Sequence, residues 1–180
     1  MTVGRYNAVA IALHWIIAAL IVAAFLLGLT IDDFPKDLQG AAINGHALTG
    51  LAILLLSVVR LFWRVANPPP PLPLSVGALT RTASLAVHMA LYILMIAIPL
   101  VGIPTLLYRG RGLDFGLFAI PSPFARTPEI YRPLTEVHEI AAYAMVGLAV
   151  AHALAALYHQ YVLRDDVLLR MLPVSRRSGG

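Results

Sequence analysis

Four long apolar runs restrict what this chain can fold into. They cover about residues 8–30, 42–62, 83–107 and 133–163. About 20 apolar residues suffice for a helix to cross the hydrocarbon core of a bilayer, and a lipid-exposed segment must satisfy its own backbone hydrogen bonds. Only 12% of the residues are charged, whereas soluble domains carry about 25%. We therefore expect an all-α integral membrane four-helix bundle, built as a single transmembrane domain over residues 1–180.

The connections between these runs differ in composition. Pro68–Pro73 holds five prolines in six residues, which predicts a stiff polyproline II connector. The segment Tyr108–Arg132 is rich in glycine, proline and aromatic residues, and a loop of that length is expected to be ordered and to cap one end of the bundle. Pro99 and Pro104 remove backbone donors late in the third run, so we expect the helix to kink or loosen there.

The basic residues predict the orientation in the membrane. If the N-terminus is cytoplasmic, eight Lys and Arg lie on that side and five on the other, which favours both termini inside. The inner set is Arg5, Arg60, Arg64, Arg81, Arg164, Arg170, Arg176 and Arg177, and the outer set is Lys36, Arg109, Arg111, Arg126 and Arg132. The net charge of +4 is explained by this flanking charge, so we expect no nucleic-acid partner.

Histidines are the candidate functional residues. The chain has six of them and no cysteine, which excludes disulfides, thiolate metal sites, iron–sulfur clusters and covalent c-type haem. His138 and His152 lie fourteen residues apart in the last run, so both project from nearly one helix face, roughly 21 Å apart along the axis. Ionisable side chains inside a membrane usually mark function. Two levels of histidine favour two cofactors stacked across the membrane, and we interpret them as haems.

A haem with two axial imidazoles needs histidines from different helices. His46 and His138 form the one combination available near the outer face. In the inner half His152 can pair with either His14 or His88, and the residues alone leave that choice open. Two histidine ligands leave no open iron position, which suits electron transfer better than oxygen binding.

Small residues surround these histidines. Gly45 and Gly50 bracket His46, and residues 141–153 include six alanines and one glycine. They leave room for a flat cofactor, but they equally allow membrane helices to pack closely, so a histidine here can also be a packing residue. His159 lies two turns beyond His152, where an imidazole, which titrates near neutral pH, can relay protons.

Taken together, these motifs resemble the prokaryotic cytochrome b561 family, and within it the small stand-alone superoxide oxidase type. The family's fold also supplies the cytochrome b subunits of nickel–iron hydrogenases and formate dehydrogenases. The matching motifs are Ala12-Leu13-His14-Trp15, Asn44-Gly45-His46 with Gly50, Val59-Arg60-Leu61, His88 to Tyr92, Ile98-Pro99-Leu100-Val101-Gly102, Tyr108-Arg109-Gly110, Phe115-Gly116, Val137-His138-Glu139, His152, His159 and the tail Leu168 to Pro173.

The resemblance implies a role for each candidate residue. It implies two haem b groups, the cytoplasmic-side one held by His14 and His152 and the periplasmic one by His46 and His138. It also implies a ubiquinone site near the cytoplasmic-side haem, where His88 and His159 are suitably placed. The positive outer loop with Arg109 and Arg111 would then attract an anionic one-electron donor such as superoxide, with steering that weakens as salt rises.

Three functional hypotheses follow. The first is a superoxide:quinone oxidoreductase of the bacterial inner membrane, which oxidises superoxide or another one-electron donor outside and reduces ubiquinone near the inside. The second is a cytochrome b membrane anchor that passes electrons from a partner dehydrogenase or hydrogenase to quinone. The third is a haem-free transporter or structural membrane protein whose histidines bind a metal or relay protons.

Overall fold

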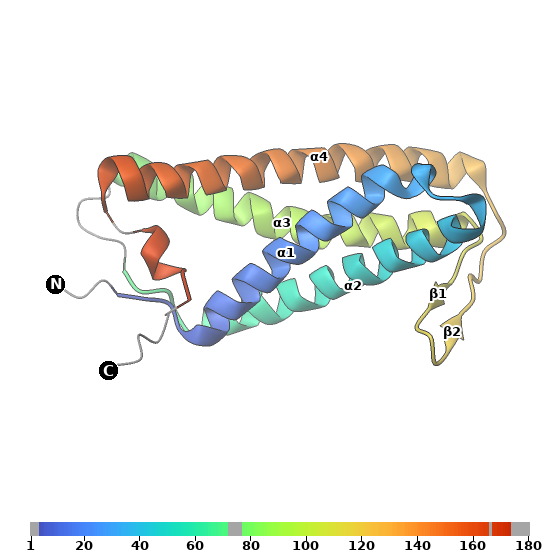
Figure 1. Ribbon diagram of the computed structural model, residues 1–180, viewed down its shortest axis with the longest axis horizontal. Helices are drawn as coiled ribbons and strands as arrows, with labels where there is room; N and C mark the ends of the chain where they lie inside the picture. The colour runs from blue at the N-terminus through green and yellow to red at the C-terminus, as the bar shows by residue number, and fades with distance from the viewer. Residues whose placement is uncertain (1–3, 72–76, 166, 174–180) are drawn as a thin grey trace.

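Four long helices make up most of the computed structural model, which describes residues 4–71, 77–165 and 167–173 (Figure 1). They are α1 Ala8–Thr30, α2 Lys36–Ala66, α3 Ala78–Tyr108 and α4 Pro128–Tyr158. All four are long and apolar enough to cross a membrane. The predicted all-α membrane helical bundle is thus confirmed.

Helices α1, α2 and α4 begin where the sequence offers a start signal, and α2, α3 and α4 begin before their apolar run. Asn7 caps α1 by accepting a hydrogen bond from the N–H of Ala10 (2.9 Å). Pro35 precedes α2, and Pro128 occupies the first turn of α4, where a missing N–H costs nothing. Helices α2, α3 and α4 therefore extend beyond the apolar stretches that predicted the spans, whereas α1 matches its stretch.

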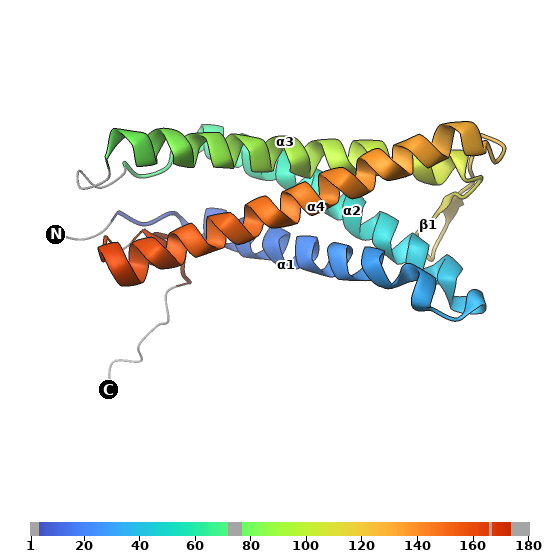
Figure 2. The ribbon, with the colours of Figure 1, turned by 90° about the horizontal axis from the view of Figure 1, so that it is seen from above.

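The helices pack in chain order, α1 on α2, α2 on α3 and α3 on α4. Seen from above, α1 and α3 lie on opposite sides, and α4 crosses obliquely over α2 between them (Figure 2). Helix α3 runs unbroken through Pro99 and Pro104. This arrangement brings α1 and α4, which are far apart in the sequence, to either side of a shared interior.

A short hairpin covers one end of the bundle, which we call the hairpin end. Strands β1 Leu113–Asp114 and β2 Ala119–Ile120 pair antiparallel. The side chain of Asn44 in α2 forms two hydrogen bonds with the backbone of Asp114, one with its carbonyl (2.8 Å) and one with its N–H (2.9 Å). The segment between α3 and α4 is thus ordered and caps this end, as predicted.

The described ends of the chain meet at the opposite end, which we call the terminal end (Figure 1). Buried Arg170, in the 3-10 turn η3 Leu168–Arg170, donates to the carbonyls of Gly4 (2.9 Å), Pro70 (2.6 Å) and Pro71 (3.0 Å). It therefore ties the N-terminal segment, the proline-rich connector and the C-terminal segment together. Leu72 and Pro73 of that connector, and Arg176 and Arg177, lie outside the described residues.

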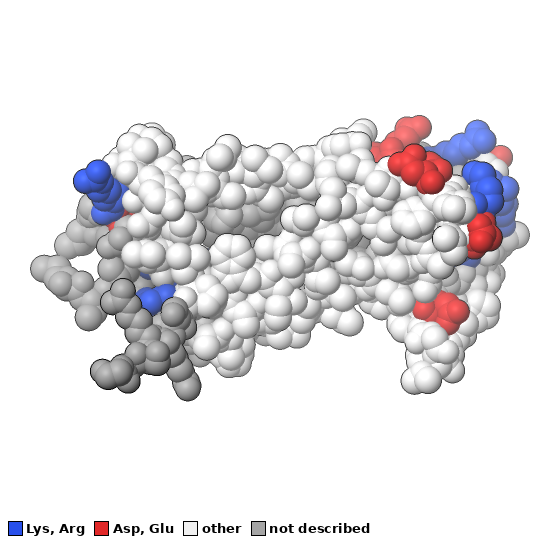
Figure 3. All heavy atoms as spheres, viewed as in Figure 1, with Lys and Arg blue, Asp and Glu red and all other residues white. Residues whose placement is uncertain are grey.

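The surface separates charged ends from an uncharged middle. On the face shown in Figure 3, Lys, Arg, Asp and Glu gather at the two ends, and the region between them carries none. Large apolar side chains are exposed on every long helix, as a lipid-covered surface requires. The buried core is small and lies in the middle of the bundle, where it consists of Ile17, Ile21, Ile53, Met95, Ile98 and Met145.

Candidate functional site

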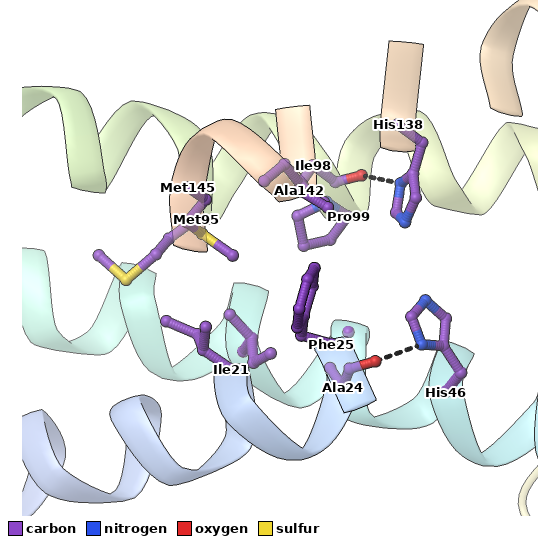
Figure 4. Close-up of a pocket in the computed structure, with 12 residues that line it drawn as sticks. Ile21, Ala24, Phe25, His46, Met95, Ile98, Pro99, His138, Ala142 and Met145 are labelled. Carbon is purple, nitrogen blue, oxygen red and sulfur yellow. Dashed lines mark hydrogen bonds between the residues drawn. The ribbon is translucent and has the colours of Figure 1, made fainter. Parts of the chain in front are cut away.

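Two histidines from different helices face each other near the hairpin end. His46 on α2 and His138 on α4 have ring centroids 5.9 Å apart. The Nδ1 of His46 donates to the carbonyl of Ala24 on α1 (3.0 Å), and the Nδ1 of His138 donates to the carbonyl of Ile98 on α3 (3.0 Å). The two remaining ring nitrogens point toward one another (Figure 4). Such an outer hydrogen bond fixes the tautomer and leaves Nε2 as the free ligand atom.

A glycine accompanies each of these two carbonyls. Gly28 lies four residues after Ala24, and Gly102 lies four residues after Ile98. A Cβ built on Gly28 would come within 3.1 Å of the His46 ring, and one built on Gly102 within 2.9 Å of the His138 ring. In a helix the side chain at i+4 stands over the carbonyl at i, so glycine there leaves room for the imidazole to reach it.

The two histidines line a cavity of about 390 Å³. A smaller one of about 60 Å³, which shares both histidines, extends toward the core and is lined there by apolar side chains such as Ile53, Met95 and Met145. The larger cavity also has polar lining residues, among them Arg109. Its volume lies in the range of pockets that hold cofactors.

The histidine spacing fits a metal held from both sides. A metal–imidazole bond is about 2.0 Å long and a ring nitrogen lies about 1 Å from the ring centre, so two axial imidazoles have centroids roughly 6 Å apart. The 5.9 Å between His46 and His138 agrees with this value. A planar haem inserted between the two free nitrogens is therefore compatible with the residues that line this cavity.

A second histidine level lies toward the terminal end. There His152 on α4 has two neighbours, His14 on α1 at 6.4 Å and His88 on α3 at 5.0 Å between ring centroids. The distance to His14 fits two ligands of one metal, whereas 5.0 Å is too short for that arrangement. The Nδ1 of His88 already donates to the carbonyl of Ser84 (2.6 Å). The geometry thus favours His14 over His88 as the partner of His152.

An arginine lies beside this second level. Arg60 on α2 donates to the hydroxyl of Tyr92 (3.0 Å) and to the carbonyl of Ala10 (2.9 Å), which precedes His14 by one helical turn. The sequence placed it in the flanking charge and in the motif Val59-Arg60-Leu61, without a role at the site. Its bonded position inside the bundle instead makes it part of the polar lining near His14.

His159 opens a π-helical turn, η2 His159–Leu163, that continues from α4. Its Nδ1 is hydrogen-bonded to the carboxylate of Asp165, which also accepts from the N–H of Val167 (3.3 Å). Arg164 between them has a left-handed backbone with φ of 55°, so the chain reverses sharply and brings Asp165 back under His159. Wide π turns are frequent at functional sites. Asp165 therefore orients His159, a partnership that the sequence analysis missed.

Arg109 and Arg111 occupy different surroundings. Arg109 is partly buried, lines the large cavity and donates to the hydroxyl of Thr135 (3.1 Å). Arg111 is exposed at the hairpin end, near Gly40. The sequence analysis expected Arg109 and Arg111 to attract an anionic donor together. In the structure Arg109 instead faces the cavity, and Arg111 faces outward.

The fold and the two histidine levels define a membrane cytochrome b, and comparison with known proteins agrees. Residues 5–174 match the family model of prokaryotic cytochrome b561, and the chain belongs to this family. Membership implies electron transfer and binding of haem b, and together with the four spans it makes the protein a multi-pass component of the bacterial inner membrane.

Three curated relatives align over nearly their whole length. The chain is 33% identical to cytochrome b561 homolog 2 of Escherichia coli (strain K12), over 99% of this chain and 97% of the relative. It is 32% identical to the Probable superoxide oxidase CybB of Yersinia pestis, over 96% and 98%. It is 30% identical to cytochrome b562 of Cereibacter sphaeroides, over 93% and 94%.

Proposed function

We propose that this protein carries electrons across the inner membrane between two haem b groups. His46 and His138 would hold one haem, and His14 and His152 the other. The observation that supports this assignment is the presence of two inter-helix histidine pairs, with ring centroids 5.9 Å and 6.4 Å apart. When bound, haem b supplies a reversible one-electron couple, and two histidine ligands keep its iron closed to other ligands.

We further propose superoxide as the donor at the hairpin end, placed on the periplasmic side, and ubiquinone as the acceptor toward the terminal end. Oxidation of two superoxide ions releases two dioxygen molecules and two electrons. Ubiquinone takes up those two electrons with two protons and becomes ubiquinol. The relative from Yersinia pestis, named a probable superoxide oxidase, supports this choice of donor.

The chain's own charges suit an anionic donor at the hairpin end. Arg111 is exposed there, and together with Arg126 and Arg132 it belongs to a segment richer in Arg than in acidic residues. An exposed cation raises the local concentration of an anion and does so less as ionic strength rises. We expect the rate with superoxide to fall with added salt, and Arg111→Glu to lower it more than Arg111→Lys.

At the terminal end we propose that His159 delivers a proton to the quinone. Its Nδ1–H is held by Asp165, so Nε2 is the atom that can take a proton from water and pass it on. We propose that His88, which contacts the His152 ring, lines the same quinone level. His159→Gln is expected to slow quinone reduction while the haem content stays unchanged.

Haem content in single variants tests the proposal. We expect about two haem b per purified chain by pyridine haemochrome, one lost in His46→Ala or His138→Ala and the other in His14→Ala or His152→Ala. The matched control is His88→Ala, which removes an imidazole from the same level and should keep both. Loss of a haem in His88→Ala with retention in His14→Ala would reverse the assignment of the second level.

The donor is tested separately. Holoprotein in liposomes that contain ubiquinone should produce ubiquinol when superoxide is generated outside, and superoxide dismutase should abolish this. Haem without superoxide-driven ubiquinol, together with copurification of a large redox subunit, would favour the membrane anchor instead. The absence of haem from fully supplied cells would contradict both.

A further inference from the structure

Arg109 is a cation with unused hydrogen-bonding capacity inside the bundle. It ends α3, where its Nε is buried without a hydrogen-bond partner among the described residues. Its Nη2 donates to the Thr135 hydroxyl (3.1 Å), and its guanidinium carbon lies 5.2 Å from the centre of the Tyr131 ring. Nearly all buried polar groups have a partner, and a charged one without a partner is costly. The orphaned Nε–H therefore calls for an acceptor that the protein itself does not provide.

This cation lines the same cavity as His46 and His138. The smaller cavity, which shares both histidines, continues from it toward the middle of the bundle and is lined there by apolar side chains such as Met95 and Met145. The larger cavity has polar lining at the hairpin end, where Arg109 and Thr135 lie. A ligand that matches both regions has an apolar body and an anionic edge. That edge would face the hairpin end.

The carboxylates that line the cavity form no ion pair with Arg109 within the described residues. Asp32 and Glu139 also line the cavity, but both are exposed, so water can solvate them. The ion pairs found within the described residues do not include Arg109. Thr135 is itself anchored, because its hydroxyl donates to the carbonyl of Tyr131 (2.8 Å) and accepts from Arg109. Thr135 thus holds the guanidinium in place, while its Nε–H remains without an acceptor among the described residues.

We infer that Arg109 binds a carboxylate of the cofactor held between His46 and His138, which is a propionate group of haem b. This inference rests on the proposed function for the identity of the cofactor. Haem b combines an apolar macrocycle with two propionates on one edge, as the cavity requires. A guanidinium presents paired N–H donors in the geometry of a carboxylate, and its charge favours the additional electron of the reduced cofactor.

The test uses purified holoprotein and two readouts that do not depend on turnover. The first is the midpoint potential of each haem, which Arg109→Gln should lower for the haem at the His46–His138 level only. The second is the redox-induced infrared difference spectrum with isotope-labelled haem carboxylates, in which Arg109→Gln should shift propionate bands. Arg109→Lys keeps the charge but loses the planar fork, so it should largely preserve the potential and still shift those bands.

The matched control is Arg111→Gln, which removes the same charge two residues away from an exposed position, and should leave the bands and haem content unchanged. Unaltered bands in both Arg109 variants would overturn the inference, even if the potential fell, because the charge alone would then explain the potential. Equal band shifts in Arg111→Gln would overturn it as well. Wild-type protein without haem would refute the proposed function itself, and the two failures are therefore distinguishable.

Discussion

At the scale of single residues, the hairpin-end histidines depend on groups that carry no functional chemistry. Each imidazole is oriented by a backbone carbonyl of a neighbouring helix, and each carbonyl is reachable because a glycine follows four residues later. The helix keeps its own i to i+4 bond while the carbonyl accepts a second hydrogen bond. Gly28 and Gly102 are therefore part of the site, although neither contacts a ligand directly.

Gly102→Ala is expected to displace the His138 ring. The added methyl would lie 2.9 Å from that ring, which costs about 1–3 kcal/mol unless the ring moves. We expect loss of one haem per chain or a marked decrease in its affinity, measured by reduced-minus-oxidised spectra of purified protein. Gly147→Ala is the control, because its added Cβ meets no atom within 4 Å and a helix favours alanine over glycine by up to about 1 kcal/mol.

The sequence alone does not reveal the role of Gly28, because that role depends on how α1 packs on α2. A glycine within an apolar helix looks like a contact between helices, which is its commonest use in membranes. Only the position of Ala24 opposite His46, set by the packing of α1 on α2, shows what Gly28 does. Gly102 was part of a recognised motif, but the motif did not reveal its role for the same reason.

At the scale of elements, the hairpin is attached to α2 next to a proposed ligand. Asn44 lies two residues before His46 and pairs with the backbone of Asp114 as another strand would. This explains why an amide stands at the start of the Asn44-Gly45-His46 motif. The loop is thereby ordered above the cavity.

Asn44→Ala is expected to release the hairpin. Two hydrogen bonds are lost, each worth about 1 kcal/mol, and no apolar packing replaces them. Hydrogen exchange at residues 113–120 should become faster in the variant. The control is Gln39→Ala, whose side chain bonds the backbone of Asp32 and Phe34 instead (3.2 Å each), and which should not alter exchange in the hairpin. Unchanged exchange in Asn44→Ala would contradict the attachment.

At the scale of the whole molecule, Arg170 joins three chain segments at the terminal end through hydrogen bonds. Arg170 has 3% of its surface exposed and reaches three chain segments, while the carbonyl of Met171 beside it accepts from the indole of Trp15 (2.8 Å). Trp15 in turn contacts His14 (5.3 Å between ring centroids). The C-terminal segment thus supports the helix that carries a proposed haem ligand.

Arg170→Ala is expected to destabilise the protein by about 2–4 kcal/mol, because it removes three hydrogen bonds that a buried charged group donates to backbone carbonyls. Thermal denaturation in detergent, followed at the haem absorption band, measures this change. Arg81→Ala removes an exposed arginine of the same end and should have little effect. Equal melting temperatures for the two variants would contradict this joining role of Arg170.

The orientation of the bundle can be tested because the natural chain has no cysteine. Leu117 at the hairpin is 98% exposed, and Arg164 is exposed at the terminal end. If both termini are cytoplasmic, a membrane-impermeant maleimide should label Leu117→Cys but not Arg164→Cys in intact spheroplasts. Lysis should make both reactive. The reverse pattern would place the proposed donor side in the cytoplasm.

The sequence by itself determined the class of fold and the family. Apolar runs of this length must become membrane helices because lipid offers the backbone no hydrogen-bond partners, and histidines at helical spacing share one face. Tertiary structure decided which side chains from different segments lie next to each other, because the packing of the helices controls those contacts. It favoured His14 over His88 beside His152, turned Arg109 inward and Arg111 outward, and joined Asp165 to His159. These relations join side chains across helices or through a left-handed turn, and no local pattern encodes them.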